Sequence, residues 1–111
     1  AAVTGAGLIV GTVHYMGPDQ LRGHAVDPSW DLWAIAVMTY EMLAGALPFP
    51  GATMADYQSA VLAGRVTPIR TLVSEASERL DTFFANALAP GSAPRPTLAS
   101  VFVTELERVL G

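Results

Sequence analysis

The sequence contains no cysteine and no lysine. Without cysteine, the chain cannot form a disulfide, use thiolate chemistry or bind zinc through thiolates. Its six basic residues are all arginine, and the net charge of −4 argues against nucleic acid or an anionic membrane as partner. Charged residues make up only 14% of the chain and apolar residues 51%, which indicates that some apolar surface packs against protein absent from this sequence.

Long hydrophobic runs are also missing. The longest, Leu32–Tyr40, is well short of the roughly 20 residues that span a bilayer, so we expect no transmembrane segment in this chain. Ala1–Val10 lacks the basic region of a signal peptide. The chain has 111 residues, enough for one small domain, and no initiator methionine, which indicates a piece of a longer protein.

Helical periodicity and capping residues predict four helices joined by loops. The expected helices are Pro28 to about Leu43, capped by Asp27 and ended by Gly45; Thr53 to about Ala63, ended by Gly64; Ser74 or Ser77 to Pro90; and a last helix capped by Thr97, with Leu98, Val101, Phe102, Leu106, Val109 and Leu110 on one face. Val66–Val73 is expected to be a connection. Leu8–Val10 is expected to be a short extended stretch, and no segment alternates convincingly as a strand.

The first predicted helix is apolar on nearly every side, with only Thr39 and Glu41 as polar residues after its first turn. A helix of this kind either spans a membrane or lies at the centre of a core. Since it is too short to span a membrane, we expect a central helix that other elements surround.

Gly11–Gly23 is rich in glycine, yet Val13, Tyr15, Met16 and Leu21 are too apolar for an ordinary solvated loop. The segment reads Gly11-Thr12-Val13-His14-Tyr15-Met16-Gly17-Pro18-Asp19, and two further motifs follow it: Asp31 to Phe49, with Trp33 and Tyr40-Glu41-Met42-Leu43, and then Arg95-Pro96. In this order and spacing, the three motifs resemble the C-terminal half of a eukaryotic-type protein kinase domain, most closely the bacterial serine/threonine kinases. The resemblance covers nearly the whole chain.

The resemblance implies roles for individual residues. The segment with Gly11, Thr12, Val13 and Tyr15 matches the floor on which a substrate peptide lies, and Thr12 matches a hydroxyl typical of Ser/Thr specificity. Asp19 and Arg95 match a buried ion pair. The remaining matched positions are Asp31 and Trp33, which support the catalytic loop, and Thr4, a candidate phosphorylation site.

The chain also departs from the family pattern. Val13 stands in place of proline, Gly17 in place of alanine, and Asp19 is one methylene shorter than the usual glutamate, which predicts a strained or partly solvated pair with Arg95. The catalytic His-Arg-Asp, the metal-binding Asp-Phe-Gly, the glycine-rich loop and the ATP-anchoring lysine are absent. Because phosphoryl transfer needs those groups, the resemblance implies ATP and Mg²⁺ in a parent domain, bound by no residue of this chain, and no metal site here.

The sequence therefore predicts a mainly α-helical, incomplete protein kinase domain, with residues 1–26 as activation segment and substrate floor and residues 27–111 as a helical lobe. The implied partners are the N-terminal half of the domain and a protein substrate with Ser or Thr hydroxyls. The implied location is cytoplasmic, with anchoring possible only through other segments. Two alternatives stay open at this point: a pseudokinase-like binding module without catalysis, and a helical bundle unrelated to kinases.

Overall fold

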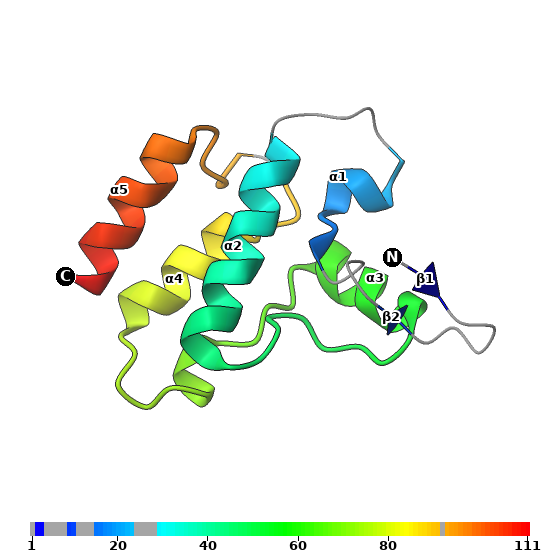
Figure 1. Cartoon of the computed structure of the whole chain (residues 1–111), viewed down its shortest axis with the longest axis horizontal. Coiled ribbons are helices and arrows are strands. Elements are labelled where there is room, and N and C mark those ends of the chain that lie inside the picture. The colour runs from blue at the N-terminus through cyan, green and yellow to red at the C-terminus, as the bar shows by residue number, and fades with distance from the viewer. Residues whose placement is uncertain (1, 4–8, 11–14, 24–28, 92) are drawn as a thin grey trace.

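The computed structural model describes residues 2–3, 9–10, 15–23, 29–91 and 93–111. Helix α2 lies in the middle, between the paired helices α4 and α5 on one side and α1 with α3 on the other (Figure 1). The elements are β1 (Ala2–Val3), β2 (Ile9–Val10), α1 (Pro18–Leu21), α2 (Ser29–Ala44), α3 (Met54–Ala63), the 3₁₀ turn η2 (Ile69–Thr71), α4 (Glu78–Ala87) and α5 (Ala99–Leu110). The prediction of a mainly α-helical chain is confirmed.

Local chemistry sets the ends of α3 and α4 where the sequence predicts them. The Thr53 hydroxyl accepts the amide of Asp56 at 3.1 Å, and Ser77 caps α4 in the same way at the amide of Leu80. Gly64 ends α3 with a φ of +70°, a left-handed conformation that glycine adopts without a steric penalty. Gly45 does the same after α2, with a φ of +73°.

The last helix begins one residue later than predicted. Leu98, not Thr97, is its N-cap, because Leu98 has an extended backbone and its carbonyl accepts the amide of Phe102 at 3.0 Å. The predicted apolar face of α5 is also only partly buried. Phe102 is buried, whereas Leu98, Val101 and Leu110 are exposed.

Two short helical elements and the pairing of two short strands were not predicted, although Ile9–Val10 was expected to be extended. The expected loop Gly11–Gly23 contains the single turn α1, which Pro18 begins with its fixed φ and which the bond from the Leu21 amide to the Gly17 carbonyl closes at 3.0 Å. The connection Val66–Val73 contains η2, and Ala2–Val3 pairs antiparallel with Ile9–Val10. Strands of two residues are too short to show alternation. The predicted helix start at Asp27 and Pro28 lies outside the described residues.

One hydrophobic core joins the helices. Leu80, Phe83, Phe84, Ala87 and Leu88 recur at helical spacing in α4 and at its C-cap, and all are buried. Ala76, which has the same spacing in the sequence, precedes the helix and is only partly buried. Edge-to-face ring contacts connect them to the middle of the lobe: Tyr40 meets Phe84 at 5.1 Å, and Phe83 meets Phe84 at the same centroid distance. The remaining buried apolar members are Trp33, Ala36, Val37, Phe49, Tyr57, Ala60, Val61, Ile69 and Phe102.

Helix α2 is not covered on every side. Trp33, Ala36, Val37 and Tyr40 recur at helical spacing and are buried. The opposite stripe, formed by Ile35, Met38 and Met42, is exposed, and Met42 retains 84% of its accessible surface. The apolar pattern of this helix therefore provides a buried face and, in addition, an apolar face that remains open.

We expect the exposed stripe of α2 to make the isolated 111-residue chain self-associate, because contiguous apolar surface favours association. Light scattering over a concentration series checks this. A variant that carries Ile35→Gln, Met38→Gln and Met42→Gln should shift the series toward monomer. A monomeric wild-type chain at all concentrations would contradict the expectation.

Candidate functional site

Residues 15–23 are the described part of the predicted substrate floor, and we refer to them as the floor segment. Two tyrosines attach it to the helices. The Tyr15 hydroxyl donates to Glu41 Oε1 of α2 at 2.7 Å, and the Tyr57 hydroxyl of α3 donates to the carbonyl of Met16 at 3.0 Å. The bond to Glu41 raises the pKa of Tyr15, with burial as a smaller cause, so Tyr15 stays a neutral donor.

Three aromatic side chains lie beneath the floor segment, and we call Trp33, Phe49 and Tyr57 the aromatic column. Trp33 and Phe49 are stacked, with centroids 5.8 Å apart and planes within 9° of parallel. Phe49 meets Tyr57 edge to face at 6.4 Å. All three residues are buried, so close packing makes the column a rigid support. Phe49, which lies between α2 and α3 in the chain, connects Trp33 of α2 with Tyr57 of α3.

Gly17 packs directly against this column. A Cβ at position 17 would lie 2.9 Å from two atoms of the Trp33 indole, closer than real Cβ contacts. The alanine that the family pattern has here would therefore require the indole to move. The departure at Gly17 has a physical reason in this chain, because the missing Cβ leaves room for Trp33.

The structure brings Asp19 and Arg95 together, although 76 positions separate them. Arg95 Nη2 lies 3.5 Å from Asp19 Oδ2, and the Arg95 side chain is 10% exposed while that of Asp19 is 28% exposed. Arg95 Nε donates to the Gly91 carbonyl at 3.2 Å, and the guanidinium lies over Trp33, 5.7 Å from the ring centroid. Asp19 also lies 3.8 Å from Nη1 of Arg22. The pair is thus long and partly solvated, in a position that links the floor segment, the aromatic column and the loop before α5.

Other predicted site residues are placed differently. Asp31 lies exposed in the first turn of α2, and Trp33 is 2% exposed in the same helix. The Trp33 Nε1 donor is buried without an acceptor in the part of the chain that the structure describes. Gly11, Thr12, Val13 and the candidate phosphorylation site Thr4 lie outside the described residues.

The sequence reasoning did not single out Glu41 and Tyr57 as site residues. Glu41 is the one acid in an otherwise apolar stretch of α2, which could have marked it as the partner of a polar group. Tyr57 carries no comparable signal, because an aromatic residue one turn into a helix usually indicates a core position. Only the folded chain shows that its hydroxyl reaches the floor segment.

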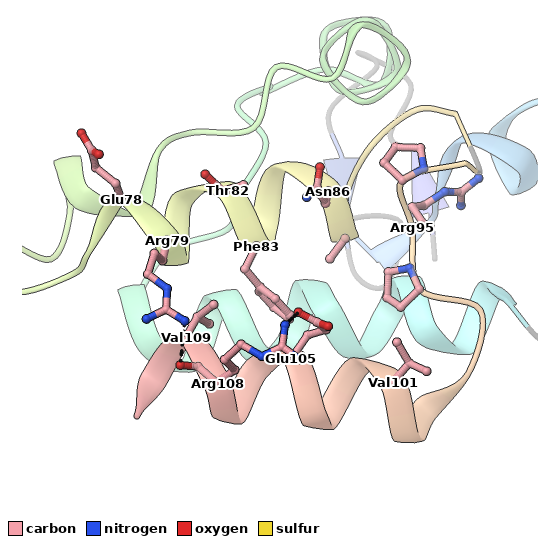
Figure 2. A pocket seen from close by; sticks show the side chains of 13 residues that line it. Glu78, Arg79, Thr82, Phe83, Asn86, Arg95, Val101, Glu105, Arg108 and Val109 are labelled. Atoms are coloured by element: carbon pink, nitrogen blue, oxygen red, sulfur yellow. Dashed lines mark hydrogen bonds and ion pairs between the residues drawn. The ribbon is translucent and has the colours of Figure 1, made fainter.

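A groove with a cavity volume of about 580 Å³ lies between α4 and α5. Figure 2 shows Arg79, Glu105 and Arg108 close together: Arg108 Nη1 pairs with Glu105 at 3.0 Å, and Arg79 Nη2 donates to the Arg108 carbonyl at 3.3 Å. The other two charged residues of the groove pair outside it, Glu78 with Arg70 and Arg95 with Asp19. Because each charged side chain already has a partner, the groove offers no built site for an ionic ligand. Within the described ranges, no group of three or more His, Asp or Glu residues could hold a metal ion.

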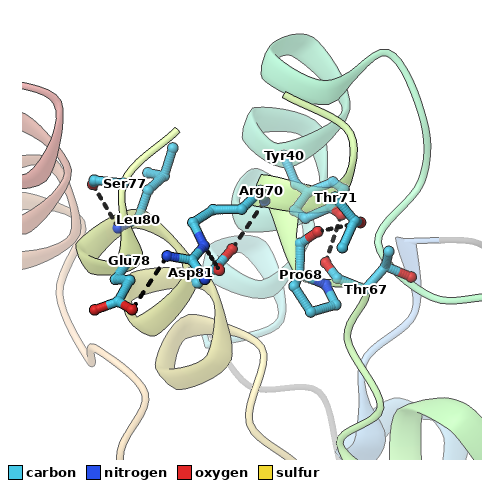
Figure 3. Close-up of polar contacts among 9 residues, drawn as sticks. All are labelled: Tyr40, Thr67, Pro68, Arg70, Thr71, Ser77, Glu78, Leu80 and Asp81. Carbon is cyan, nitrogen blue, oxygen red and sulfur yellow. Dashed lines mark hydrogen bonds and ion pairs between the residues drawn. The ribbon is translucent and has the colours of Figure 1, made fainter. Parts of the chain in front are cut away.

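A separate polar cluster ties α2 and α4 to η2 (Figure 3). The Tyr40 hydroxyl donates to the Thr67 carbonyl at 2.6 Å, and Arg70 Nε pairs with Asp81 at 3.0 Å. Burial, together with the charge of Asp81, raises the pKa of Tyr40 to about 12. These bonds join residues of α2, η2 and α4 and the Thr67 carbonyl without involving residues 15–23, so the cluster stabilises the lobe.

Comparison with known proteins identifies the family. The family model described as the protein kinase domain matches residues 4–106, so the chain belongs to the protein kinase domain family. It is 34% identical to the serine/threonine-protein kinase pkn3 of Myxococcus xanthus over 97% of the chain, and 29% identical to the serine/threonine-protein kinase PknL of Mycobacterium tuberculosis over 98%. It is also 33% identical to the tyrosine-protein kinase MasK of Myxococcus xanthus over 96% of the chain.

The chain spans only part of these relatives: 20% of pkn3, 27% of PknL and 17% of MasK. The family match excludes the unrelated helical bundle, and the names of the relatives do not favour the pseudokinase alternative. Among the described residues, no helix is long and apolar enough to cross a membrane.

Proposed function

We propose that this chain is the C-terminal part of a serine/threonine protein kinase catalytic domain, residues 1–26 forming the end of the activation segment and the substrate floor, and residues 27–111 the helical lobe. The observation that carries the proposal is the attachment of the floor segment at three neighbouring points: Met16 to Tyr57, Gly17 to Trp33 and Asp19 to Arg95. A surface held in this way can present a protein substrate in one orientation.

In this proposal, the chain positions and supports but does not itself perform phosphoryl transfer. ATP and Mg²⁺ are held by other residues of the kinase domain, because this sequence lacks the catalytic and metal-binding motifs, the glycine-rich loop and the lysine that hold them in the family. Gly11, Thr12, Val13 and Tyr15 line the peptide site, Thr12 contacts the catalytic aspartate, and exposed Asp31 accepts backbone amides of the catalytic loop. Phosphorylation at Thr4 is a further proposed event. Because the proposed reaction consumes ATP, we propose that this part of the protein lies in the cytoplasm.

The test compares the complete protein with the 111-residue chain alone, using labelled ATP and a generic basic protein substrate. We expect transfer to serine and threonine by the complete protein and none by the chain alone. Phosphoamino-acid analysis distinguishes phosphoserine and phosphothreonine from phosphotyrosine. This distinction matters because the chain is also similar to the tyrosine-protein kinase MasK. Phosphate transfer by the 111-residue chain alone, or phosphotyrosine as the main product of the complete protein, would contradict the proposal.

A matched pair of variants tests the role of Thr12. Thr12→Val removes a hydroxyl proposed to bond a charged group, so we expect kcat/KM to fall about tenfold to a hundredfold. Thr39→Val is the control, because the Thr39 hydroxyl donates only within α2, to the Ile35 carbonyl at 2.7 Å, and its loss should leave kcat/KM near the wild-type value. Equal effects of the two variants would contradict the assignment.

A further inference from the structure

The hydrogen bond from Tyr57 to Met16 joins α3 to the backbone of the floor segment across 41 positions of sequence. Tyr57 is 1% exposed, so its hydroxyl has left bulk water and needs a partner inside the protein. Burial raises the pKa of Tyr57 strongly, which keeps the hydroxyl a neutral donor throughout the physiological range. The Met16 carbonyl is therefore held by a group that pH does not switch.

Tyr57 is fixed at both its ring and its backbone. Phe49 packs edge to face against it, and behind Phe49 lies the stacked indole of Trp33. The backbone at Gly51, whose φ is +149°, approaches so closely that a Cβ there would lie 2.7 Å from the Tyr57 nitrogen. Since neither the ring nor the start of α3 can shift freely, the hydroxyl occupies one defined place.

This bond differs in kind from the other attachments of the floor segment. Tyr15 and Asp19 are attached through their own side chains, to Glu41 and Arg95, so neither of these bonds holds a backbone group of Met16 or Gly17. The bond to Met16 instead holds a carbonyl. Because a peptide group is planar, holding that carbonyl also fixes the orientation of the Gly17 amide. On its other side Gly17 is held by α1, because its carbonyl accepts the Leu21 amide at 3.0 Å, so the bond from Tyr57 restrains the one peptide plane of this glycine that α1 does not hold.

We propose that Tyr57 is a positioning residue for the protein substrate, holding the Met16–Gly17 peptide plane so that helix α3 sets the shape of the floor on which the substrate lies. This inference rests on the proposed kinase function. It predicts that the hydroxyl affects recognition of the protein substrate and leaves ATP recognition unchanged.

Two single-atom deletions in the complete protein test it. Tyr57→Phe removes the bond to the Met16 carbonyl and keeps the ring; Tyr40→Phe is the matched control, since Tyr40 is equally buried and donates to the Thr67 carbonyl away from the floor segment. We expect Tyr57→Phe to raise the KM for a peptide substrate about fivefold, as for the loss of one hydrogen bond, with the KM for ATP unchanged. Tyr40→Phe should lower the melting temperature without changing either KM.

Hydrogen exchange provides a readout that does not depend on activity. The Leu21 amide, which donates to the Gly17 carbonyl at 3.0 Å, should exchange faster in Tyr57→Phe than in the wild type and in Tyr40→Phe. If the wild-type protein transfers phosphate and Tyr57→Phe keeps the wild-type peptide KM, the inference is wrong while the proposed function stands. The inference is also wrong if Tyr40→Phe raises the peptide KM as much as Tyr57→Phe does. If the wild type transfers no phosphate, the proposed function fails, and unchanged exchange at Leu21 then overturns the positioning role separately.

Discussion

Replacement of Trp33 by alanine should lower the free energy of unfolding by about 3–5 kcal/mol, the usual cost of deleting a buried tryptophan side chain. Trp33 is 2% exposed, stacks on Phe49 and lies beneath the Arg95 guanidinium. Its loss would leave a cavity bordered by Gly17, where no side chain can fill the space. Denaturant unfolding of the complete protein, followed by circular dichroism, measures the change, because fluorescence would lose one of two tryptophans.

Trp33→Phe is the matched variant. It retains a ring against Phe49 and removes the indole donor that has no acceptor within the described ranges, so relief of that unpaired group offsets part of the packing loss. The phenylalanine variant should therefore lose clearly less stability than the alanine variant. Equal losses, or a loss below about 1 kcal/mol for Trp33→Ala, would show that the aromatic column does not support the lobe.

Removal of the Arg95 side chain should have the second largest effect. An exposed ion pair contributes about 0–1 kcal/mol, and breaking a buried one costs about 3–5 kcal/mol. With a separation of 3.5 Å and Asp19 28% exposed, this pair should fall between the two limits. Arg95→Ala should cost more than Asp19→Ala, because Arg95 also loses its bond to Gly91 and its contact with Trp33.

A double-mutant cycle on the two positions separates the pair from these other contacts. The double variant should lose less stability than the sum of the two single variants. Arg22→Ala is the control: Arg22 approaches the same carboxylate at 3.8 Å but is largely exposed, so its removal should change stability by less than about 0.5 kcal/mol. Strict additivity at Asp19 and Arg95 would show that their contact is energetically irrelevant.

The sequence predicts most of the helical boundaries, because local chemistry determines them. Thr53, Ser77, Gly45 and Gly64 act at helix ends in ways that depend only on neighbouring residues. The single turn α1 was not predicted, because Gly17 and Pro18 favour a turn or a loop and four helical residues are too few to show a periodicity.

The candidate site could be predicted only in part. Asp19, Trp33 and Arg95 stand in motifs whose resemblance to the protein kinase pattern implies their roles, including the pairing of Asp19 with Arg95. The bond between Tyr57 and Met16 depends on where α3 packs, which no local pattern encodes. The clash at Gly17 depends on the position of an indole 16 residues away in the sequence, so the replacement of alanine by glycine could be noticed from the sequence but not explained.

The contact between Gly17 and Trp33 also constrains how this protein can evolve. A side chain can be gained at position 17 only after the indole has moved or has been replaced by a smaller ring, since a Cβ would otherwise lie 2.9 Å from it. The family pattern has alanine at this position together with the tryptophan, so a small displacement of the indole must be able to accommodate a Cβ. The residue at position 17 and the placement of the indole are therefore coupled, and an alanine that the family pattern accepts should be costly in this chain unless Trp33 shifts.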